Sequence, residues 1–402
     1  MSIIRNVTIE AEKYLFDDKI LIFVGARQAG KTTILKQIQA ILEGKGELVY
    51  FLNLEDPDYL SLLNESPKNL FKIFNLDSKK RNFILIDEIQ YLNNPSNFLK
   101  YFYDEYRQKI KLITSGSSAF YIDRKFKDSL VGRKRLFNVR TLSFKEFLRF
   151  KNEDALSHRN LKDISLSEKE KVSNYYREYI IYGGYPRVVL APLSEKEEVL
   201  RDIAYSYVKK DIYEANIRQD EVFYKLFKIL ASQIGNLINA SELANTLGVS
   251  KTAIDNYLYI MRKSFHIGMV KPFYKNLRKE LTKMPKGYFL DLGLRNFFVS
   301  NFKPFEMRED KGVLLENAVF RHLLETYSDD EIRFWRTIQK NEVDFIVAGR
   351  QSFEVKINPH QLKKNSYKVF LRNYPDISLS VVSMEKKCES VGNLKVLNVW
   401  EL

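Results

Sequence analysis

The stretch Gly25-Ala-Arg-Gln-Ala-Gly-Lys31-Thr32 decides the fold of the N-terminal part of this chain. It has the spacing GxxxxGK[ST] and lies between an apolar run, residues 20–24, and a helical pattern that begins at Thr33. In such a setting the loop N–H groups cradle phosphate, the lysine reaches the outer phosphates and the threonine hydroxyl ligates Mg²⁺. The alternative is a glycine-rich turn that binds nothing. The predicted phosphate-binding residues are Gly25, Ala26, Arg27, Gln28, Ala29, Gly30, Lys31, Thr32 and Thr33.

Outward from this loop, residues 1–120 alternate apolar runs with helical stretches. The predicted strands are residues 20–24, 48–53, 83–87 and 111–115. Alternation of this kind predicts an α/β fold in which helices wind around a parallel sheet.

Two acids, Asp87 and Glu88, end the third of these strands. Ligands bind beyond the carboxyl ends of parallel strands, so both carboxylates are expected beside the phosphate site. The sequence predicts that Asp87 holds Mg²⁺ through water and that Glu88 orients an attacking water molecule. The alternative for such acids is an ordinary helix N-cap.

Two further candidates follow the fourth strand. Ser115 begins the run Ser-Gly-Ser-Ser and is predicted to sense the outermost phosphate, with Thr114 and Ser117 as alternatives; a turn of small polar residues would look similar. Residues 124–151 carry ten Lys or Arg and two Asp or Glu. Within them Arg133 is a candidate arginine finger near a subunit edge, although such a run is often a solvated face.

The composition restricts the partners. The 402 residues include 65 Lys or Arg and 51 Asp or Glu, a net charge of +14. A basic chain favours polyanionic partners, nucleic acid first, although a lysine-rich soluble surface would give the same balance. Cys388 is the only cysteine, which argues against a disulfide framework and fits a reducing cytosol. No apolar run approaches the roughly 20 residues that span a bilayer, so we expect a cytoplasmic protein with no membrane partner.

Residues 226–290 have the pattern of a winged helix. Residues 241–258 read as a helix, a turn containing Gly248 and a second helix that Ser250 can cap, followed by strand-like residues 269–274 and 287–291. From Lys251 to Lys286 there are nine Lys or Arg and two Asp or Glu, among them Lys279 and Lys283, so we expect phosphate contacts with DNA. The alternative is a module for packing or protein docking.

Four residues near the C-terminus form a second chemical candidate. Glu316 lies in the apolar stripe of a predicted helix, where a carboxylate needs a partner. In the predicted strands 342–347 and 353–357, Asp344, Glu354 and Lys356 project from the face opposite the apolar one. Carboxylates beside a lysine suit a metal-activated water that attacks phosphate, with Glu316, Asp344 and Glu354 as ligands and Lys356 as the catalytic cation. The alternative is a solvated sheet face with ordinary salt bridges.

These motifs resemble those of a known family. Residues 1–225 resemble AAA+ ATPases of the archaeal and bacterial type through GARQAGKTT, LIDEIQ, SGSSAF, LVGR, LSFKEFL and YGGYP. Residues 226–402 are similar to the C-terminal region common in that group, a winged helix followed by a PD-(D/E)xK nuclease-like domain, through LLENAVF, EVDFIV and FEVK. The resemblance implies ATP and Mg²⁺ as cofactors and Glu88 as the acid that activates water.

Together these patterns predict four parts. They are an AAA+ P-loop core (1–150), a helical lid (151–225), a winged helix (226–305) and a small α/β restriction-endonuclease-like domain (306–402). The expected function is ATP hydrolysis coupled to action on DNA, with metal-dependent cleavage as a further activity; a homo-oligomer is also expected. The alternative is a nucleotide-dependent regulatory switch that binds DNA or protein and cuts nothing.

Overall fold

A computed structural model describes residues 3–116, 130–215, 217–274, 280, 283–339, 341–362, 367–384 and 388–402. The chain divides into two compact units. The first comprises Met1–Arg140 with Lys263–Phe265, and the second comprises Thr141–Arg262 with His266–Leu402. The four-part division drawn from the sequence stays a prediction.

The first unit contains a parallel sheet in the order β2-β3-β4-β1-β5. Its strands are β1 (Ile20–Gly25), β2 (Leu48–Asn53), β3 (Asn82–Asp87), β4 (Ile110–Gly116) and β5 (Lys134–Val139). The predicted parallel α/β sheet is therefore confirmed, and the four expected strands lie where the apolar runs placed them. The sequence did not predict the fifth strand, because β5 is rich in Lys and Arg and only partly apolar.

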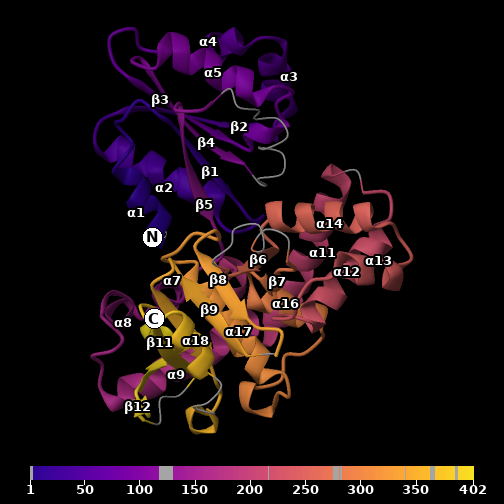
Figure 1. Ribbon diagram of the computed structural model, residues 1–402. Coiled ribbons are helices and arrows are strands. Elements are labelled where there is room, and N and C mark those ends of the chain that lie inside the picture. The colour runs from indigo at the N-terminus through magenta and orange to yellow at the C-terminus, as the bar shows by residue number, and fades with distance from the viewer. Residues whose placement is uncertain are drawn as a thin grey trace. The chain divides into compact units, whose positions relative to one another are not determined.

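Helices cover both faces of this sheet (Figure 1). They are α1 (Asn6–Glu12), α2 (Lys31–Gly44), α3 (Pro57–Glu65), α4 (Leu70–Ile73) and α5 (Pro95–Tyr106). Ile20, Ile22 and Val24 of β1 share one core with Phe98 and Phe102 of α5. Side chains alternate along a strand, so Phe23 points to the other face, where it stacks on Phe137 at 5.0 Å. Both faces of β1 are thus buried, which fixes the strand that leads into the glycine-rich loop.

The second unit is mostly helical up to residue 262, and further helices lie among its later strands. Its helices are α7 (Phe144–Phe150), α8 (Asp154–His158), α9 (Leu166–Tyr182), α10 (Pro186–Leu190), α11 (Lys196–Glu214), α12 (Asp220–Ser232), α13 (Ala240–Leu247), α14 (Lys251–Lys263), α16 (Leu292–Phe298), α17 (Lys311–Leu323) and α18 (Lys368–Asn373). Ser143 and Ser165 begin α7 and α9 with capping boxes, in which the serine accepts from an N–H of the first turn and a glutamate returns the bond. The starts of these two helices are therefore determined by residues that are close together in the sequence.

One sheet of eight strands runs through the C-terminal half, in the order β12-β13-β11-β10-β9-β8-β6-β7. The strands are β6 (Ile267–Pro272), β7 (Lys286–Phe289), β8 (Ile332–Arg336), β9 (Glu342–Val347), β10 (Gln351–Val355), β11 (Ser378–Ser383), β12 (Ser390–Val391) and β13 (Leu394–Asn398). The antiparallel pair β6–β7 joins the rest because β6 pairs in parallel with β8 through Lys271↔Arg333 and Pro272↔Phe334. The sequence predicted the two strands of this hairpin but not that they extend another sheet.

The YGGYP segment has a structural role within the second unit. Gly183 has a φ of +76°, and a Cβ atom there would lie 2.2 Å from Asp291 Oδ1. A Cβ on Gly184 would lie 2.5 Å from the Leu142 carbonyl oxygen. The Gly184 N–H donates to Asp291 Oδ2 (2.9 Å), and its carbonyl accepts from the Leu142 N–H (2.7 Å). Only glycine allows this close approach, so the motif fixes the turn after α9 onto two distant segments.

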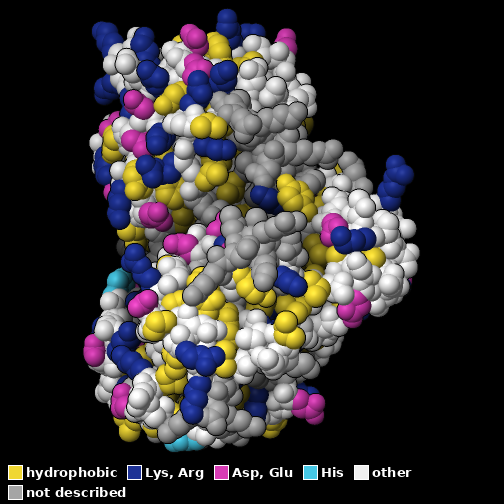
Figure 2. All heavy atoms as spheres, in the orientation of Figure 1, with side chains coloured by type: hydrophobic (Ala, Val, Ile, Leu, Met, Phe, Trp, Pro, Cys, Tyr) yellow, Lys and Arg dark blue, Asp and Glu magenta, His cyan; other side chains and the backbone are white. Residues whose placement is uncertain are grey.

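Charged side chains are spread over the visible surface. Figure 2 shows Lys and Arg side chains scattered over this face with Asp and Glu among them. Net charge alone therefore does not single out one binding surface there. Among the residues that the structure describes, no helix is both long and apolar enough to cross a lipid bilayer.

Candidate functional site

The strand order of the first unit brings three predicted segments to one edge. β4 lies between β1 and β3, and all three strands run in parallel. Their carboxyl ends therefore meet at the same edge of the sheet. The loop after β1, Ser115 near the end of β4, and Asp87 at the end of β3 all lie there.

The backbone of the glycine-rich loop depends on unusual torsion angles. Gln28 has a φ of 58° and Gly30 a φ of 96°, and α2 begins at the next residue. Gly25 admits no side chain, because a Cβ there would lie 1.9 Å from the Val139 carbonyl oxygen. The loop thus presents the N-terminus of α2, where the backbone N–H groups and the helix dipole favour a bound anion.

Lys31 is the first residue of α2, and its side chain folds back against the loop. It is 5% exposed, and its Nζ atom donates to the carbonyl oxygens of Gly25 (3.1 Å) and Ala26 (3.0 Å). A buried ammonium needs such acceptors. The contacts hold the charge within the loop, where it can also face the oxygens of a phosphate group.

Thr32, Asp87 and Ser115 lie in direct contact. The Thr32 hydroxyl donates to Asp87 Oδ2 at 2.6 Å, and the Ser115 hydroxyl donates to Asp87 Oδ1. Asp87 is 2% exposed, so its carboxylate is oriented by these two hydroxyl groups rather than by water. A hydroxyl beside a carboxylate is a set of oxygen donors that Mg²⁺ prefers. Of the alternatives to Ser115, Thr114 is equally buried, but its hydroxyl has no hydrogen-bond partner among the residues that the structure describes. Ser117 lies outside the described residues.

Glu88 has a backbone conformation that is rare for its type. Its φ is 56°, in the left-handed region, and its N–H donates to Ser115 Oγ at 3.1 Å. Gln90 donates through Nε2 to Glu88 Oε2. Strained backbone of this kind often marks functional residues. Gln90 lies within the LIDEIQ motif, but the sequence alone indicates no role for it.

Arg133 lies far from the phosphate loop of its own chain. Its carbonyl oxygen accepts from the Ile20 N–H, at the start of β1, whereas Gly25 pairs with Val139 at the other end. Five residues of strand separate these ends, a distance of about 17 Å. The Arg133 side chain donates to Asp104 Oδ1 at 2.7 Å. An arginine-finger role for Arg133 therefore requires the site of a second subunit.

Arg5 supports the loop and was missed from the sequence. It is 5% exposed, and its guanidinium donates to the carbonyl oxygens of Ala29 (2.7 Å) and Arg140 (2.9 Å). One side chain thus ties the loop to the end of β5. Arg5 precedes its partner Ala29 by 24 residues and belongs to no motif, so nothing in the sequence indicates the contact.

The C-terminal candidates come together on the hairpin β9–β10. Phe353 pairs with Phe345 in antiparallel register, and the next step of this register places Glu354 opposite Asp344. Asp344 is 8% exposed and Glu354 is 4% exposed. The solvated-face alternative is therefore wrong for these two carboxylates. Ile346, which shares a strand face with Asp344 by alternation, packs in a buried core, so this face is covered as well.

Further contacts around Asp344 and Glu354 come from the end of β10 and from α17. Lys356 donates through Nζ to Glu354 Oε1, and the Val355 N–H donates to Asp344 Oδ2 at 2.8 Å. Glu316 of α17 accepts on Oε1 from the Tyr288 hydroxyl at 2.5 Å. We name Glu316, Glu342, Asp344 and Glu354, with Lys286 and Lys356, the carboxylate cluster.

Burial and like charge dominate the electrostatics of the carboxylate cluster. Burial raises the pKa of Asp344 well above its usual value, and the neighbouring Glu354 and Glu316 raise it further. Burial also raises the pKa of Glu354, although the nearby Lys356 opposes this shift. Carboxylates held together in this way are short of positive charge, which a divalent cation would supply.

The carboxylates of the cluster do not converge on a single point in this structure. Among the described residues, no group of three His, Cys, Asp or Glu side chains is arranged closely enough to hold a metal ion. Lys286 and Tyr288 of β7 contact Glu316, although the sequence patterns place them in the predicted winged helix and not in the C-terminal domain. Only the pairing of β6 with β8 reveals their position.

Comparison with known proteins bears on the first unit most clearly. Residues 17–148 match a family model described as an AAA domain. The first unit has an α/β P-loop fold of the AAA type. Two further models, each described as a domain of unknown function, match residues 173–304 and 311–402. The ATPase part of the resemblance is thus supported, and the winged helix and nuclease-like domain stay predictions.

Relatives match over most of the chain. An uncharacterised protein of Methanocaldococcus jannaschii is 28% identical over 389 residues, which are 94% of this chain and 83% of that protein. An uncharacterised protein of Haemophilus influenzae is 28% identical over 377 residues, 88% of each chain. The Thermotoga maritima RuvB Holliday junction branch migration motor shares 16% identity with a TM-score of 0.35, covering 69% of this chain and 94% of that one. A likeness this low carries no argument about function.

Proposed function

We propose that the protein binds ATP with Mg²⁺ and hydrolyses it at the loop after β1. The observation that carries this proposal is the contact between Thr32 Oγ1 and Asp87 Oδ2, 2.6 Å apart, beside the N-terminus of α2. The two groups come from opposite sides of β4 and meet at the edge where phosphate would lie. Their oxygens match the ligands that Mg²⁺ takes alongside nucleotide phosphates.

Each residue then has a separate task. The loop N–H groups and Lys31 hold the phosphates, and Thr32 and Asp87 would hold the metal, which neutralises charge that develops on the phosphates. Glu88 orients the attacking water. Ser115 connects the Asp87 carboxylate to the backbone of Glu88, since its hydroxyl donates to Asp87 and accepts from the Glu88 N–H. Its proposed role, sensing the outermost phosphate, would act through these two contacts.

Replacement of Lys31 by alanine tests the binding step. A hydrogen bond to a charged group contributes about 1.5–3 kcal/mol, so Lys31→Ala should weaken Mg·ATP binding by about ten- to a hundredfold or more. Equilibrium titration with a fluorescent ATP analogue measures this change. Lys45→Ala, at an exposed site after the end of the same helix, is the control and should bind normally. Unchanged affinity in Lys31→Ala would refute the assignment of the loop.

We further propose that the protein acts on DNA through a winged helix formed by α13, α14 and the β6–β7 hairpin. Gly248 caps the C-terminus of α13 with a φ of 67°, and the Ser250 hydroxyl accepts from the Ala253 N–H at the start of α14. α14 buries an apolar stripe that includes Ile254, Leu258 and Met261, and it exposes its other face. That face and the hairpin line an open groove that includes Lys251, Tyr259, Arg262 and Lys283. A helix with basic and hydrogen-bonding side chains on its open face suits the major groove.

Binding to DNA should depend on salt. Each Lys or Arg that reaches a phosphate contributes about 0.9 to the slope of log K against log salt. Reversal of Arg262 and Lys283 to Glu should therefore lower affinity for all sequences alike and reduce the slope by about two. Fluorescence anisotropy with duplexes of unrelated sequence measures both. Lys279, the other candidate phosphate contact, lies outside the described residues.

The control for this experiment is Lys162→Glu, which makes the same charge change on the exposed segment before α9. It should leave the slope unchanged. An affinity that does not vary with salt would favour the alternative, in which these helices dock a protein.

A second activity, metal-dependent cleavage of DNA, is proposed for the carboxylate cluster. What supports it is the opposition of Asp344 and Glu354 on a buried hairpin with Lys356 bonded to Glu354. Carboxylate oxygens are the ligands that Mg²⁺ and Mn²⁺ prefer, although Glu316, Asp344 and Glu354 would have to move closer together to share one ion. Asp344, Glu354 and Glu316 would hold the metal, which acidifies a water molecule, and Lys356 would neutralise charge on the phosphate.

The competing function is a nucleotide-dependent switch that binds DNA or protein without cutting. It shares the ATP site, so the ATPase tests do not distinguish the two; a nuclease assay does. Assembly into a homo-oligomer would be needed for Arg133 to reach a second subunit's nucleotide, and a cytoplasmic location accords with the single cysteine.

A further inference from the structure

Lys286, at the start of β7, lies within the carboxylate cluster. Its Nζ atom is 3.0 Å from Glu316 Oε1, 2.5 Å from Glu342 Oε1 and 4.0 Å from Asp344 Oδ1. The residue is 3% exposed. Although burial lowers the pKa of Lys286, the neighbouring Glu316, Asp344 and Glu342 raise it above its usual value, so the ammonium stays charged. A buried cation this well paired is not an ordinary surface contact.

The Lys286 ammonium occupies space that a metal ion would need. A divalent cation held by both Glu316 and Asp344 would lie about 2.0–2.6 Å from an oxygen of each. The ammonium already bonds to Glu316 at 3.0 Å and lies 4.0 Å from the nearer oxygen of Asp344. Two cations in a buried site repel each other far more strongly than they do in water. The two therefore exclude each other.

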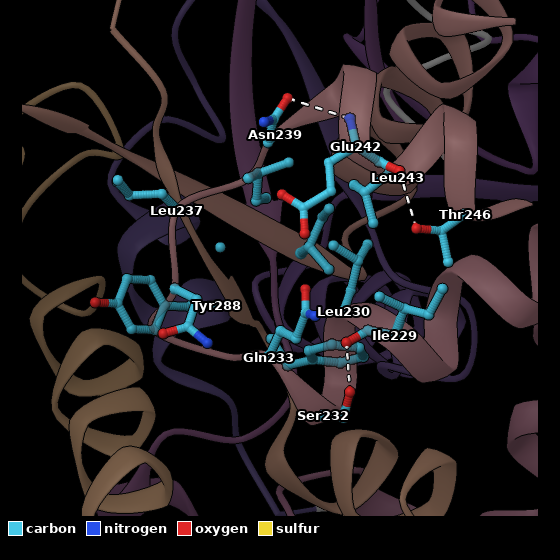
Figure 3. A pocket seen from close by; sticks show the side chains of 15 residues that line it. Ile229, Leu230, Ser232, Gln233, Leu237, Asn239, Glu242, Leu243, Thr246 and Tyr288 are labelled. Atoms are coloured by element: carbon cyan, nitrogen blue, oxygen red, sulfur yellow. Dashed lines mark hydrogen bonds between the residues drawn. The ribbon is translucent and has the colours of Figure 1, made fainter.

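We propose that Lys286 is an exchangeable internal counter-ion, which holds the carboxylate cluster together until a divalent cation displaces it. This inference rests on the proposed metal site. The strand that carries Lys286 has free space beside it, because Gly287, Tyr288 and Phe289 line a pocket of about 160 Å³ (Figure 3). Since β7 is one strand of the β6–β7 hairpin, a ligand that moves this hairpin would also control entry of the metal.

Calorimetric titration of the full chain with Mn²⁺, without nucleotide, tests the exchange. A like charge within about 4–6 Å changes ionic affinity by about ten- to a thousandfold. Lys286→Met should therefore bind Mn²⁺ at least about tenfold more tightly than the wild type. Lys286→Arg, which keeps the charge, should bind as the wild type does. Lys303→Met, which removes an exposed lysine before α17, is the matched control.

The outcomes separate this inference from the proposed metal site. Equal Mn²⁺ affinity in Lys286→Met and the wild type would overturn the exchange and leave the metal site standing. If Lys286→Met binds no more Mn²⁺ than Lys286→Met combined with Asp344→Asn, both the exchange and the metal site fail. The double variant also subtracts any Mn²⁺ bound elsewhere in the protein.

A measurement on the wild type protects the test against misfolding of the variant. Reductive methylation modifies accessible lysines, and mass spectrometry locates them. Lys286 should be protected without metal and should become reactive when Mn²⁺ saturates the cluster. Unchanged protection of Lys286 at saturating Mn²⁺ would overturn the proposal.

Discussion

Glu88→Gln is expected to bind Mg·ATP as the wild type does and to lose nearly all turnover. The amide keeps the shape of the side chain and an oxygen that can accept from Gln90, but it cannot take a proton from water. Proton transfer by a positioned side chain contributes about 10²- to 10⁴-fold to a rate, so turnover should fall by that factor. Single-turnover and steady-state phosphate release, with a separate binding titration, measure the two effects.

The matched control is Glu43→Gln, the same chemical change at an exposed position on α2. It should keep the full rate. Equal turnover by Glu88→Gln and the wild type would show that another group activates the water. A parallel loss of binding would show instead that Glu88 supports the loop.

Asp344→Asn is expected to remove both Mn²⁺ binding and DNA cleavage. The asparagine retains an oxygen for the Val355 N–H, so the hairpin should persist while a metal ligand is weakened and its charge is lost. A metal contributes several kcal/mol to phosphate chemistry, which corresponds to a fall of about 10³-fold or more in cleavage rate. Single-stranded, duplex and branched DNA should be assayed with Mg²⁺ or Mn²⁺, with and without ATP.

Two comparisons make this result specific. Asp376→Asn, at an exposed turn before β11, should cleave normally, and Asp344→Asn should keep its ATP affinity because Lys31 belongs to the other unit. Cleavage by Asp344→Asn at the wild-type rate would remove the residue from the mechanism. If the wild type cuts none of these substrates, the switch function is favoured.

Local patterns predicted the first unit well. The apolar run of β1, the glycines after it and the acids after β3 each specify a structure through neighbours in the sequence, and parallel pairing then brings Asp87 to Thr32. The geometry of the C-terminal hairpin followed similarly, because alternation along a strand placed Asp344 and Glu354 on one face.

Contacts between distant segments could not be predicted. Arg5 supports the loop through a carbonyl oxygen, which any residue offers, so no side-chain pattern announces the contact. Lys286 looked like one more basic residue of a DNA-binding hairpin, and its burial depends on β6 pairing with β8. Asp344 and Glu354 are buried for a similar reason, because other elements pack on their face of the strands. The alternation of side chains along a strand predicts which residues share a face, but not what covers that face.

The shared sheet has a practical consequence for any attempt to divide the protein. A cut near residue 305 would separate β6 and β7 from β8, although the three strands belong to one sheet. The fragment beginning there would expose the hydrogen-bonding edge of β8, and such open edges promote aggregation. It would also leave Glu316 without the lysine and tyrosine that bond to it. We therefore expect residues 226–305 and 306–402 to melt as one cooperative unit rather than as separate modules.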